Sequence, residues 1–210
     1  MNMRIYLDFD DTILDTGGFK NELLKAFQSA GATEEDFRNN YEAAKAKVGG
    51  FDLDTILEAF AGTGGFDAAA ARIRAYDMLY HIDAFVHDDF FDFAREFGKE
   101  QLALLSYGAT PMQRIKIENS KITPYLGEII VTDQGKEEHF PGIMERHPGK
   151  KIYFVDDKAE QIDRVKAATP GVTAMKMERP GGLHTHTESR LADHVVKDFR
   201  EVANIIKSKR

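Results

Sequence analysis

The sequence predicts an α/β fold, in which helices cover a parallel sheet and a helical insert follows the first strand. Two observations predict this fold. Short apolar runs alternate with stretches of helical periodicity, and this alternation is typical of right-handed βαβ units. Between the first and second apolar runs, residues 16–89 show helical periodicity without a convincing strand. The chain of 210 residues suits one domain, or one domain with an insert.

The elements of the sheet follow in chain order. The apolar runs expected to form strands are Ile5–Phe9, Leu102–Ser106, Glu128–Val131, Ile152–Val155 and Val172–Met175. The helices expected between them are Pro111–Asn119, Lys136–Arg146 and Lys158–Ala168. Residues 188–210 are expected to form one long amphipathic helix that docks on the sheet. One face of that helix would hold Leu191, Val195, Phe199, Val202 and Ile206.

The insert is expected to consist of helices joined by glycine-containing turns. Its apolar residues at helical spacing are Phe19, Leu23, Leu24, Phe27, Ile56, Leu57, Phe60, Ile73, Met78, Leu79, Ile82 and Val86. The glycine pairs in "TGGFK", "VGGFD" and "GTGGFD" are irregularly spaced, which favours helix-boundary turns over a repeat, with Asp52 and Asp67 near N-cap positions. We therefore divide the chain into an α/β core, residues 1–15 and 90–210, and a helical insert, residues 16–89. Residues 87–89 are expected to be an exposed hinge.

Composition limits the classes of function. Apolar residues make up 42% and charged residues 30% of the chain, as in soluble globular proteins. The net charge of −7 argues against sequence-independent binding to nucleic acid, which needs a basic surface. The absence of cysteine excludes thiol chemistry and cysteine-ligated zinc. We expect no signal peptide and no membrane span, and hence a cytoplasmic protein. The sequence does not indicate whether it is a monomer or a homodimer.

Polar residues with possible chemical roles follow four of the predicted strands. Asp8, Asp10 and Asp11 end the first, and Ser106 and Tyr107 follow "LALL". Lys136 follows "EIIVTDQG", and Asp156 and Asp157 follow "IYFV". Ligands of parallel sheets bind at the carboxyl ends of the strands, so these side chains are expected to share one site. A divalent cation would offset the repulsion between the acids, and oxygen ligands suit Mg²⁺.

In order and position, these residues resemble the motifs of the haloacid dehalogenase-like superfamily, most of whose members are Mg²⁺-dependent phosphohydrolases. The first motif corresponds to Asp8-Phe9-Asp10-Asp11-Thr12, the second to Ser106, the third to Lys136 and the fourth to "FVDDKAEQI". The insert resembles the helical C1-type cap of subclass I. The resemblance implies a Rossmann-like three-layer core with a cap inserted after the first strand.

The resemblance also implies a role for each residue. Asp8 would attack phosphorus to give an aspartyl-phosphate, and Asp10 would protonate the leaving alcohol and then activate water. Ser106 and Lys136 would hold the phosphoryl group, helped by the backbone N–H groups of Tyr107 and Gly108. The Mg²⁺ ligands would be Asp8, the Asp10 carbonyl, Asp156 and Asp157, with the order of the last two left open. The substrate would be a small phosphorylated metabolite.

Other interpretations remain open. A phosphomutase would share the aspartyl-phosphate, and a non-catalytic phosphate sensor could share the fold. A dehalogenase also uses an aspartate nucleophile, but it needs neither a leaving-group acid nor a metal for phosphate, so Asp10 argues against it. Lys150 and Lys151 compete with Lys136 for the third motif, although they directly precede a strand. His184 and His186 in "GGLHTHTESR" are expected to lie in a solvent-exposed loop rather than to bind metal.

Overall fold

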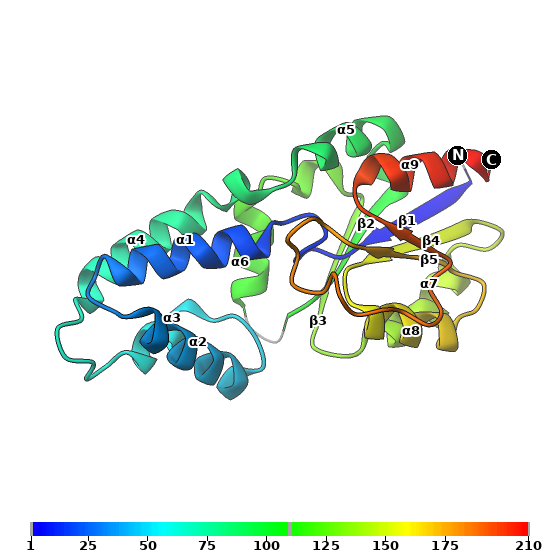
Figure 1. Ribbon diagram of the computed structural model, residues 1–210. Coiled ribbons are helices and arrows are strands. Elements are labelled where there is room, and N and C mark those ends of the chain that lie inside the picture. The colour runs from blue at the N-terminus through cyan, green and yellow to red at the C-terminus, as the bar shows by residue number, and fades with distance from the viewer. Residues whose placement is uncertain (1, 109–110, 210) are drawn as a thin grey trace. The chain divides into compact units, whose positions relative to one another are not determined.

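The computed structural model describes residues 2–108 and 111–209. Within these ranges the strands form one parallel sheet with the order β3-β2-β1-β4-β5-β6 (Figure 1). The strands are β1 (Met3–Leu7), β2 (Leu102–Tyr107), β3 (Glu128–Thr132), β4 (Lys151–Asp156), β5 (Thr173–Met177) and β6 (His194–Val196). The prediction of an α/β fold built on a parallel sheet is confirmed, with β6 as an unpredicted strand.

Helices cover both faces of this sheet. The α-helices are α1 (Thr16–Gln28), α2 (Glu34–Val48), α3 (Leu53–Ala59), α4 (Ala68–Tyr80), α5 (Asp88–Phe97), α6 (Met112–Asn119), α7 (Phe140–Arg146), α8 (Ala159–Ala168) and α9 (Phe199–Ser208). The 3₁₀-helices in the described ranges are η1 (Ile82–Phe85), η2 (Lys99–Gln101), η3 (Thr123–Tyr125) and η4 (Lys136–His139). Helices α5 and α9 lie on one face of the sheet, and α7 and α8 lie on the other, giving three layers (Figure 1). None of the helices in the described ranges is both long and apolar enough to cross a membrane.

The central strand β1 is buried along its whole length, as expected at the centre of a parallel sheet, and its one charged residue, Arg4, pairs with Glu128 of β3 at 2.7 Å. On the face covered by α7 and α8, the ring centroid of Phe140 lies 5.9 Å from that of Tyr6 and 5.1 Å from that of Phe154. Burial of each such side chain contributes about 1.5–3 kcal/mol to folding. The rings pack across β1 and β4, which pair in parallel, so the residues that follow the two strands lie at one edge of the sheet.

Contacts divide the chain into two compact units. We call Met1–Gly17, Val86–Tyr107 and Ile122–Arg210 the core unit, and Gly18–Phe85 and Gly108–Lys121 the helical unit. The predicted division placed residues 108–121 in the core, and here it differs from the structure. Helix α6 contacts α4 and η1. In addition, the Asn119 amide donates to the Leu79 carbonyl at 3.0 Å, and Lys121 pairs with Asp83 at 2.6 Å.

Residues 87–89 were predicted to form an exposed hinge, and the prediction that they are exposed is wrong. His87 and Asp89 are half-buried, and only Asp88 is exposed. The Asp89 carboxylate pairs with the buried Arg179 guanidinium at 2.7 Å and accepts the backbone N–H of Phe199 at 2.8 Å. These contacts join the start of α5 to the start of α9 within the core unit, so the segment is fixed by tertiary contacts.

The helical unit is built around a cluster of aromatic rings. The ring centroid of Phe27 lies 5.3 Å from that of Phe37, 4.9 Å from that of Phe60 and 5.6 Å from that of Phe66. As predicted, Asp52 caps α3 by accepting from Thr55 N, and Asp67 caps α4 by accepting from Ala70 N.

Two features of the helical unit differ from the sequence analysis. Ile73, assigned to the apolar face of a helix, is 72% exposed, because α4 buries its alanine face and Leu79 instead. Helix α2 was not predicted at all. It is rich in charged residues, and a reciprocal capping box between Thr33 and Asp36 marks its start.

The predicted helix over residues 188–210 is wrong in its first half. Residues 194–196 form β6, which pairs in parallel with β5, and α9 begins only at Phe199. Asp198 accepts from Glu201 N at 2.8 Å and so caps the helix at that point. Leu191 and Val195, assigned to the buried helical face, are 45% and 56% exposed. Hydrogen bonding to the edge of the sheet therefore overrides the helical spacing.

Candidate active site

The first element of the site is a tight turn directly after β1. Asp8 N donates to the Val155 carbonyl of β4 at 2.9 Å, so the strand pairing continues up to Asp8. The Phe9 carbonyl then accepts from both Ile13 N and Leu14 N at 2.9 Å. Asp11 takes a left-handed conformation with φ of 54°, which aspartate tolerates better than most residues. The turn therefore presents three acids at the carboxyl end of the central strand.

Three acids from two adjacent strands meet at this edge of the core unit. Carboxylate oxygens of Asp8, Asp156 and Asp157 all lie within 4.8 Å of one another, and all three residues are buried. They come together because β1 and β4 are neighbours in register, with Leu7 opposite Val155. Buried carboxylates at this spacing repel one another and require a cation or hydrogen bonds.

Lys136 supplies one such cation. Its Nζ lies 2.5 Å from Asp8 Oδ1 and 2.6 Å from Asp156 Oδ2, and its side chain is 2% exposed. Burial raises the pKa of Asp8 to about 6, with Lys136 acting against this shift and Asp156 adding to it. Burial lowers the pKa of Lys136, whereas the charges of Asp156 and Asp8 and their hydrogen bonds raise it. Together these two acids outweigh burial, so the pKa shifts upward and the amine stays charged.

The loop after β3 places Lys136. The Thr132 hydroxyl accepts from Gln134 N at 3.0 Å and lies 2.9 Å from His139 Nε2. Lys136 begins η4, which continues into α7, so the predicted helix 136–146 starts with a 3₁₀ turn. The competing Lys151 is exposed at the start of β4, and Lys150 is half-buried just before it. The structure thus places Lys136 beside the acids.

Asp156 and Asp157 have different surroundings, which the sequence could not distinguish. Asp156 accepts from Lys136 through Oδ2 and from Lys158 N through Oδ1 at 2.8 Å. Neither oxygen of the buried Asp157 has a hydrogen-bond partner in the described part of the chain. Burial, followed by the charges of Asp156 and Asp8, raises the pKa of Asp157 to about 10. A buried carboxyl of this kind fits a divalent cation, which would supply the missing partner.

Asp10 is held by a hydrogen bond from Thr16, which follows the turn. The Thr16 hydroxyl donates to Asp10 Oδ1 at 3.2 Å and accepts from Asp11 N at 3.0 Å. Thr16 was not identified from the sequence. Thr16 follows Asp10 by six residues, at the start of α1, and no sequence pattern links the two. Only the folded turn shows that they meet.

A pocket of ≈ 360 Å³ opens at this edge of the core unit. Its lining residues are Asp8, Asp10, Tyr107, Lys136, Lys158, Glu160, Gln161 and His184. Of the predicted phosphate-binding residues, Tyr107 and Lys136 line the pocket. Ser106 is buried at the carboxyl end of β2 and is not among the described residues that line it. The role assigned to Ser106 stays a prediction.

Lys158 and His184 were not assigned to the site from the sequence. Lys158 directly follows the acidic pair, and this adjacency could have identified it. Burial lowers its pKa, but Asp8, Asp157 and Asp156 raise it more, so the net shift is upward. His184 was expected in a solvent-exposed loop, yet its half-exposed ring lines the pocket. Only the path of the loop after β5 shows this.

Comparison with known proteins identifies the fold. No family model matches the sequence, and no curated protein matches it. The chain resembles the solved structure of a haloacid dehalogenase-like hydrolase from Burkholderia xenovorans LB400, with a TM-score of 0.75, 18% identity, and coverage of 96% of this chain and 97% of that one. A HAD-hydrolase from Bacillus subtilis, YfnB, bound to magnesium, gives a TM-score of 0.61, 17% identity, and coverage of 98% and 99%.

The same fold occurs in dehalogenases. The L-2-haloacid dehalogenase from Xanthobacter autotrophicus gives a TM-score of 0.64 at 16% identity, with 99% of each chain covered. The protein therefore has the fold of haloacid dehalogenase-like hydrolases.

Proposed function

We propose that this protein is a Mg²⁺-dependent phosphohydrolase that acts on a small phosphorylated metabolite through an aspartyl-phosphate on Asp8. The observation that carries the proposal is the pairing of two features at one edge of the sheet. A buried carboxyl, Asp157, has no hydrogen-bond partner in the described ranges, and a second acid, Asp10, lines the same pocket as Asp8. The first feature suits a metal, and the second suits a general acid.

The donor set fits Mg²⁺, a hard cation usually held by one or two carboxylates, water and substrate phosphate. Asp8 and Asp157 would hold it, together with the Asp10 carbonyl that the family resemblance implies. Asp156 already accepts from Lys136 and from Lys158 N, so we assign it to orienting Lys136. When bound, the cation would neutralise the carboxylates and the phosphoryl oxygens, so that one anion can approach another.

The residues of the pocket divide the reaction between them. An oxygen of Asp8 attacks phosphorus, and the bond from phosphorus to the ester oxygen breaks. Asp10 gives its proton to the departing alcohol and later takes a proton from the water that hydrolyses the acyl phosphate. Thr16 orients Asp10 through the hydrogen bond to Oδ1. Lys136 stays charged beside Asp8 and would also bind a phosphoryl oxygen, as would Tyr107 and Ser106.

A dehalogenase is the competing hydrolase, since solved dehalogenases share the fold. It would need the Asp8 nucleophile but not a general acid, because a halide leaves without a proton. The position of Asp10 in the pocket, held by Thr16, supports phosphate chemistry. A phosphomutase would use the same residues but would require a bisphosphate activator.

The test is phosphate release from a panel of phosphate monoesters, with and without Mg²⁺, alongside halide release from 2-haloacids. We expect Mg²⁺-dependent phosphate release and no halide. Asp10→Asn should slow the first-turnover release of alcohol from alkyl phosphates by ~10²–10⁴-fold but the first-turnover release of p-nitrophenol much less, because that leaving group needs no proton. Halide release that is independent of Mg²⁺ would contradict the proposal.

Mg²⁺ binding is expected to release a proton. With a pKa of about 10, the Asp157 carboxyl is protonated at pH 7 in the metal-free protein, whereas a metal requires the carboxylate. The Kd for Mg²⁺ should therefore fall about tenfold per unit between pH 7 and pH 9. Isothermal titration calorimetry in buffers of different ionisation enthalpy measures both the affinity and the proton. A Kd that does not change with pH would contradict this prediction.

The same pKa has a consequence for stability. In the folded protein Asp157 keeps its proton up to about pH 10. In the unfolded chain the same carboxyl loses its proton from about pH 4 upward. The metal-free protein should therefore lose stability from this group as the pH rises from about 4 to about 10, and Asp157→Asn should remove that dependence.

A further inference from the structure

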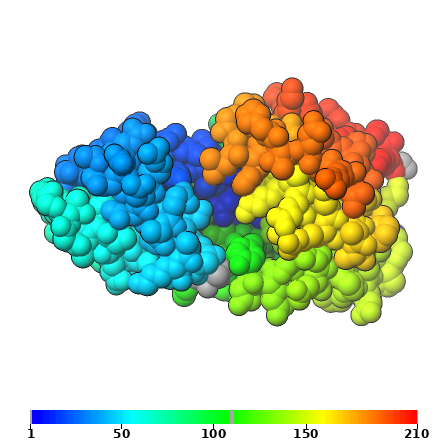
Figure 2. Space-filling view, turned by 60° about the horizontal axis from the view of Figure 1, so that its bottom comes forward, coloured from blue at the N-terminus to red at the C-terminus, as the bar shows by residue number. Residues whose placement is uncertain are grey.

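The loop between β5 and β6 brings a histidine to the acids. In the space-filling view this loop, in orange, lies against the yellow segment that contains β4 and α8 (Figure 2). The Ser189 hydroxyl donates to Asp163 of α8, which fixes the far end of the loop. His184 lines the pocket, and its Nε2 lies 3.9 Å from Asp157 Oδ2.

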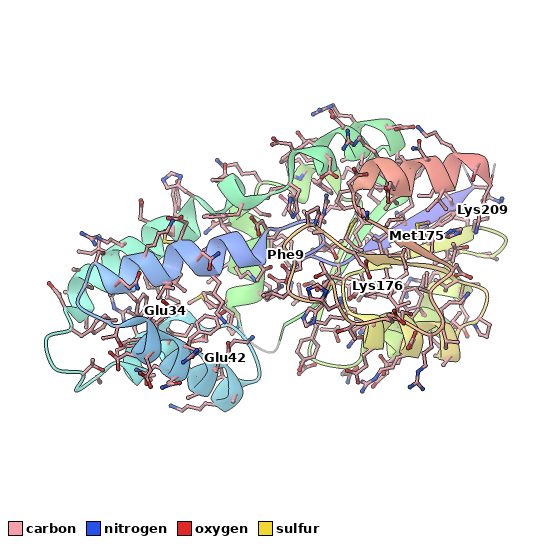
Figure 3. All side chains as sticks on the ribbon, viewed as in Figure 1. Phe9, Glu34, Glu42, Met175, Lys176 and Lys209 are labelled. Atoms are coloured by element: carbon pink, nitrogen blue, oxygen red, sulfur yellow. The ribbon has the colours of Figure 1, made fainter. Side chains whose placement is uncertain are left out.

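A buried lysine anchors the backbone at this histidine. Lys176 of β5, labelled in Figure 3, is completely buried. Its Nζ donates to Glu178 Oε1 at 2.6 Å and to the His184 carbonyl at 3.1 Å. A buried ammonium is costly without such partners, so its contact restricts where the His184 backbone can lie. The loop is also closed by Gly182 N donating to the Arg179 carbonyl at 2.9 Å. These contacts hold the His184 backbone within the core unit.

The acid that faces this ring at 3.9 Å lacks an orienting partner among the described residues. Asp157 accepts no hydrogen bond from the described residues, whereas Asp156 has two donors. Carboxylates that bind metals are normally held by an outer hydrogen bond, and losing that bond weakens metal affinity. A small rotation of the ring would bring the 3.9 Å separation between His184 Nε2 and Asp157 Oδ2 to hydrogen-bond distance.

We infer that His184 is a positioning residue for the metal site, whose imidazole holds one oxygen of Asp157 and leaves the other for the cation. The inference rests on the Mg²⁺ site of the proposed function. It assigns a role to a loop outside the four motifs, and it adds a metal-orienting contact from the segment after β5 that the motifs do not contain.

The test is calorimetric titration with Mg²⁺ in the absence of substrate. His184→Ala should raise the Kd for Mg²⁺ by about 10–100-fold, the range typical of lost outer-shell partners. His184→Gln keeps a donor and should recover part of the affinity, which a purely structural role would not predict. His186→Ala, in the same loop and exposed, is the matched control and should leave the Kd unchanged. Circular dichroism and thermal melting verify that each variant is folded.

Two results would overturn the inference. One is a folded His184→Ala variant that binds Mg²⁺ within about twofold of the wild type. The other is a raised KM for substrate with unchanged Mg²⁺ affinity, which would make His184 a substrate contact. Failure of the proposed function is separate. The wild type could bind Mg²⁺ through Asp157, shown by loss of binding in Asp157→Asn, and yet hydrolyse no ester. That result would refute the phosphatase, and the Mg²⁺ titration of the His184 variants would still decide the role of His184. A wild type that binds no Mg²⁺ would refute both.

Discussion

Asp8→Asn is expected to abolish phosphate release, with a loss on the order of 10⁴-fold or more, while the protein remains folded. An amide cannot attack phosphorus to form an acyl phosphate, and no other carboxylate is as well placed to take over. Asp156 is engaged by Lys136 and by Lys158 N, and Asp10 is held by Thr16. Asp157, the third acid of the cluster, is assigned to the metal. The side-chain volume is nearly conserved, and Lys136 keeps its contact with Asp156 at 2.6 Å. The fold should therefore survive.

The measurement combines steady-state phosphate release with trapping of the acyl phosphate by acid quench and mass spectrometry. The wild type should gain one phosphoryl group on the peptide that contains Asp8, sensitive to hydroxylamine, and Asp8→Asn should gain none. Asp11→Asn is the matched control, because it removes an adjacent buried acid and asparagine tolerates the φ of 54° at that position. Turnover by Asp8→Asn comparable to that of Asp11→Asn would exclude Asp8 as the nucleophile.

Lys136→Met is expected to have the largest effect on stability. It removes the ammonium that bridges Asp8 and Asp156 and leaves two buried carboxylates facing each other. Removing one partner of a buried ion pair costs about 3–5 kcal/mol, because the remaining charge is unpaired. For a protein of this size, the Tm should fall by roughly 6–20 °C.

The effect should depend on pH in a defined direction. The pKa of Asp8 is already raised to about 6, and loss of Lys136 removes an interaction that lowers it. Protonation at low pH therefore relieves the repulsion, so the deficit relative to the wild type should be smaller at pH 5 than at pH 8. Lys151→Met changes an exposed lysine at the start of β4 and should shift stability by less than about 0.5 kcal/mol. Equal melting temperatures for the two variants would refute the assignment of Lys136 to the site.

Much of the fold was predictable because its signals are local. The runs around Leu7, Leu104 and Val155 are apolar throughout, which marks them as buried strands, and these strands are neighbours in the sheet. Asp52 and Asp67 were predicted near N-caps because a cap depends on a side chain and a backbone N–H three residues apart. The helix α2 was missed because its charged sequence offers little apolar periodicity, and only its capping box marks it.

Errors arose where a distant partner decided the local structure. Leu191 and Val195 share helical spacing with Phe199, but residues 194–196 pair with β5, and that pairing competes with the helix. Residues 108–121 follow β2 in the chain, yet α6 packs on α4. Neither choice can be read from the segment itself.

For the site, the sequence alone determined that the acids after the first and fourth predicted strands meet, because parallel strands carry the residues at their carboxyl ends to one edge of the sheet. Asp8, Asp156 and Asp157 meet there as a result. Only the tertiary structure decided how each group is used. It engaged Asp156 through Lys136, left Asp157 without a partner in the described ranges and brought His184 within 3.9 Å of it. Burial and charge depend on neighbours from distant parts of the chain, and those neighbours exist only in the folded protein.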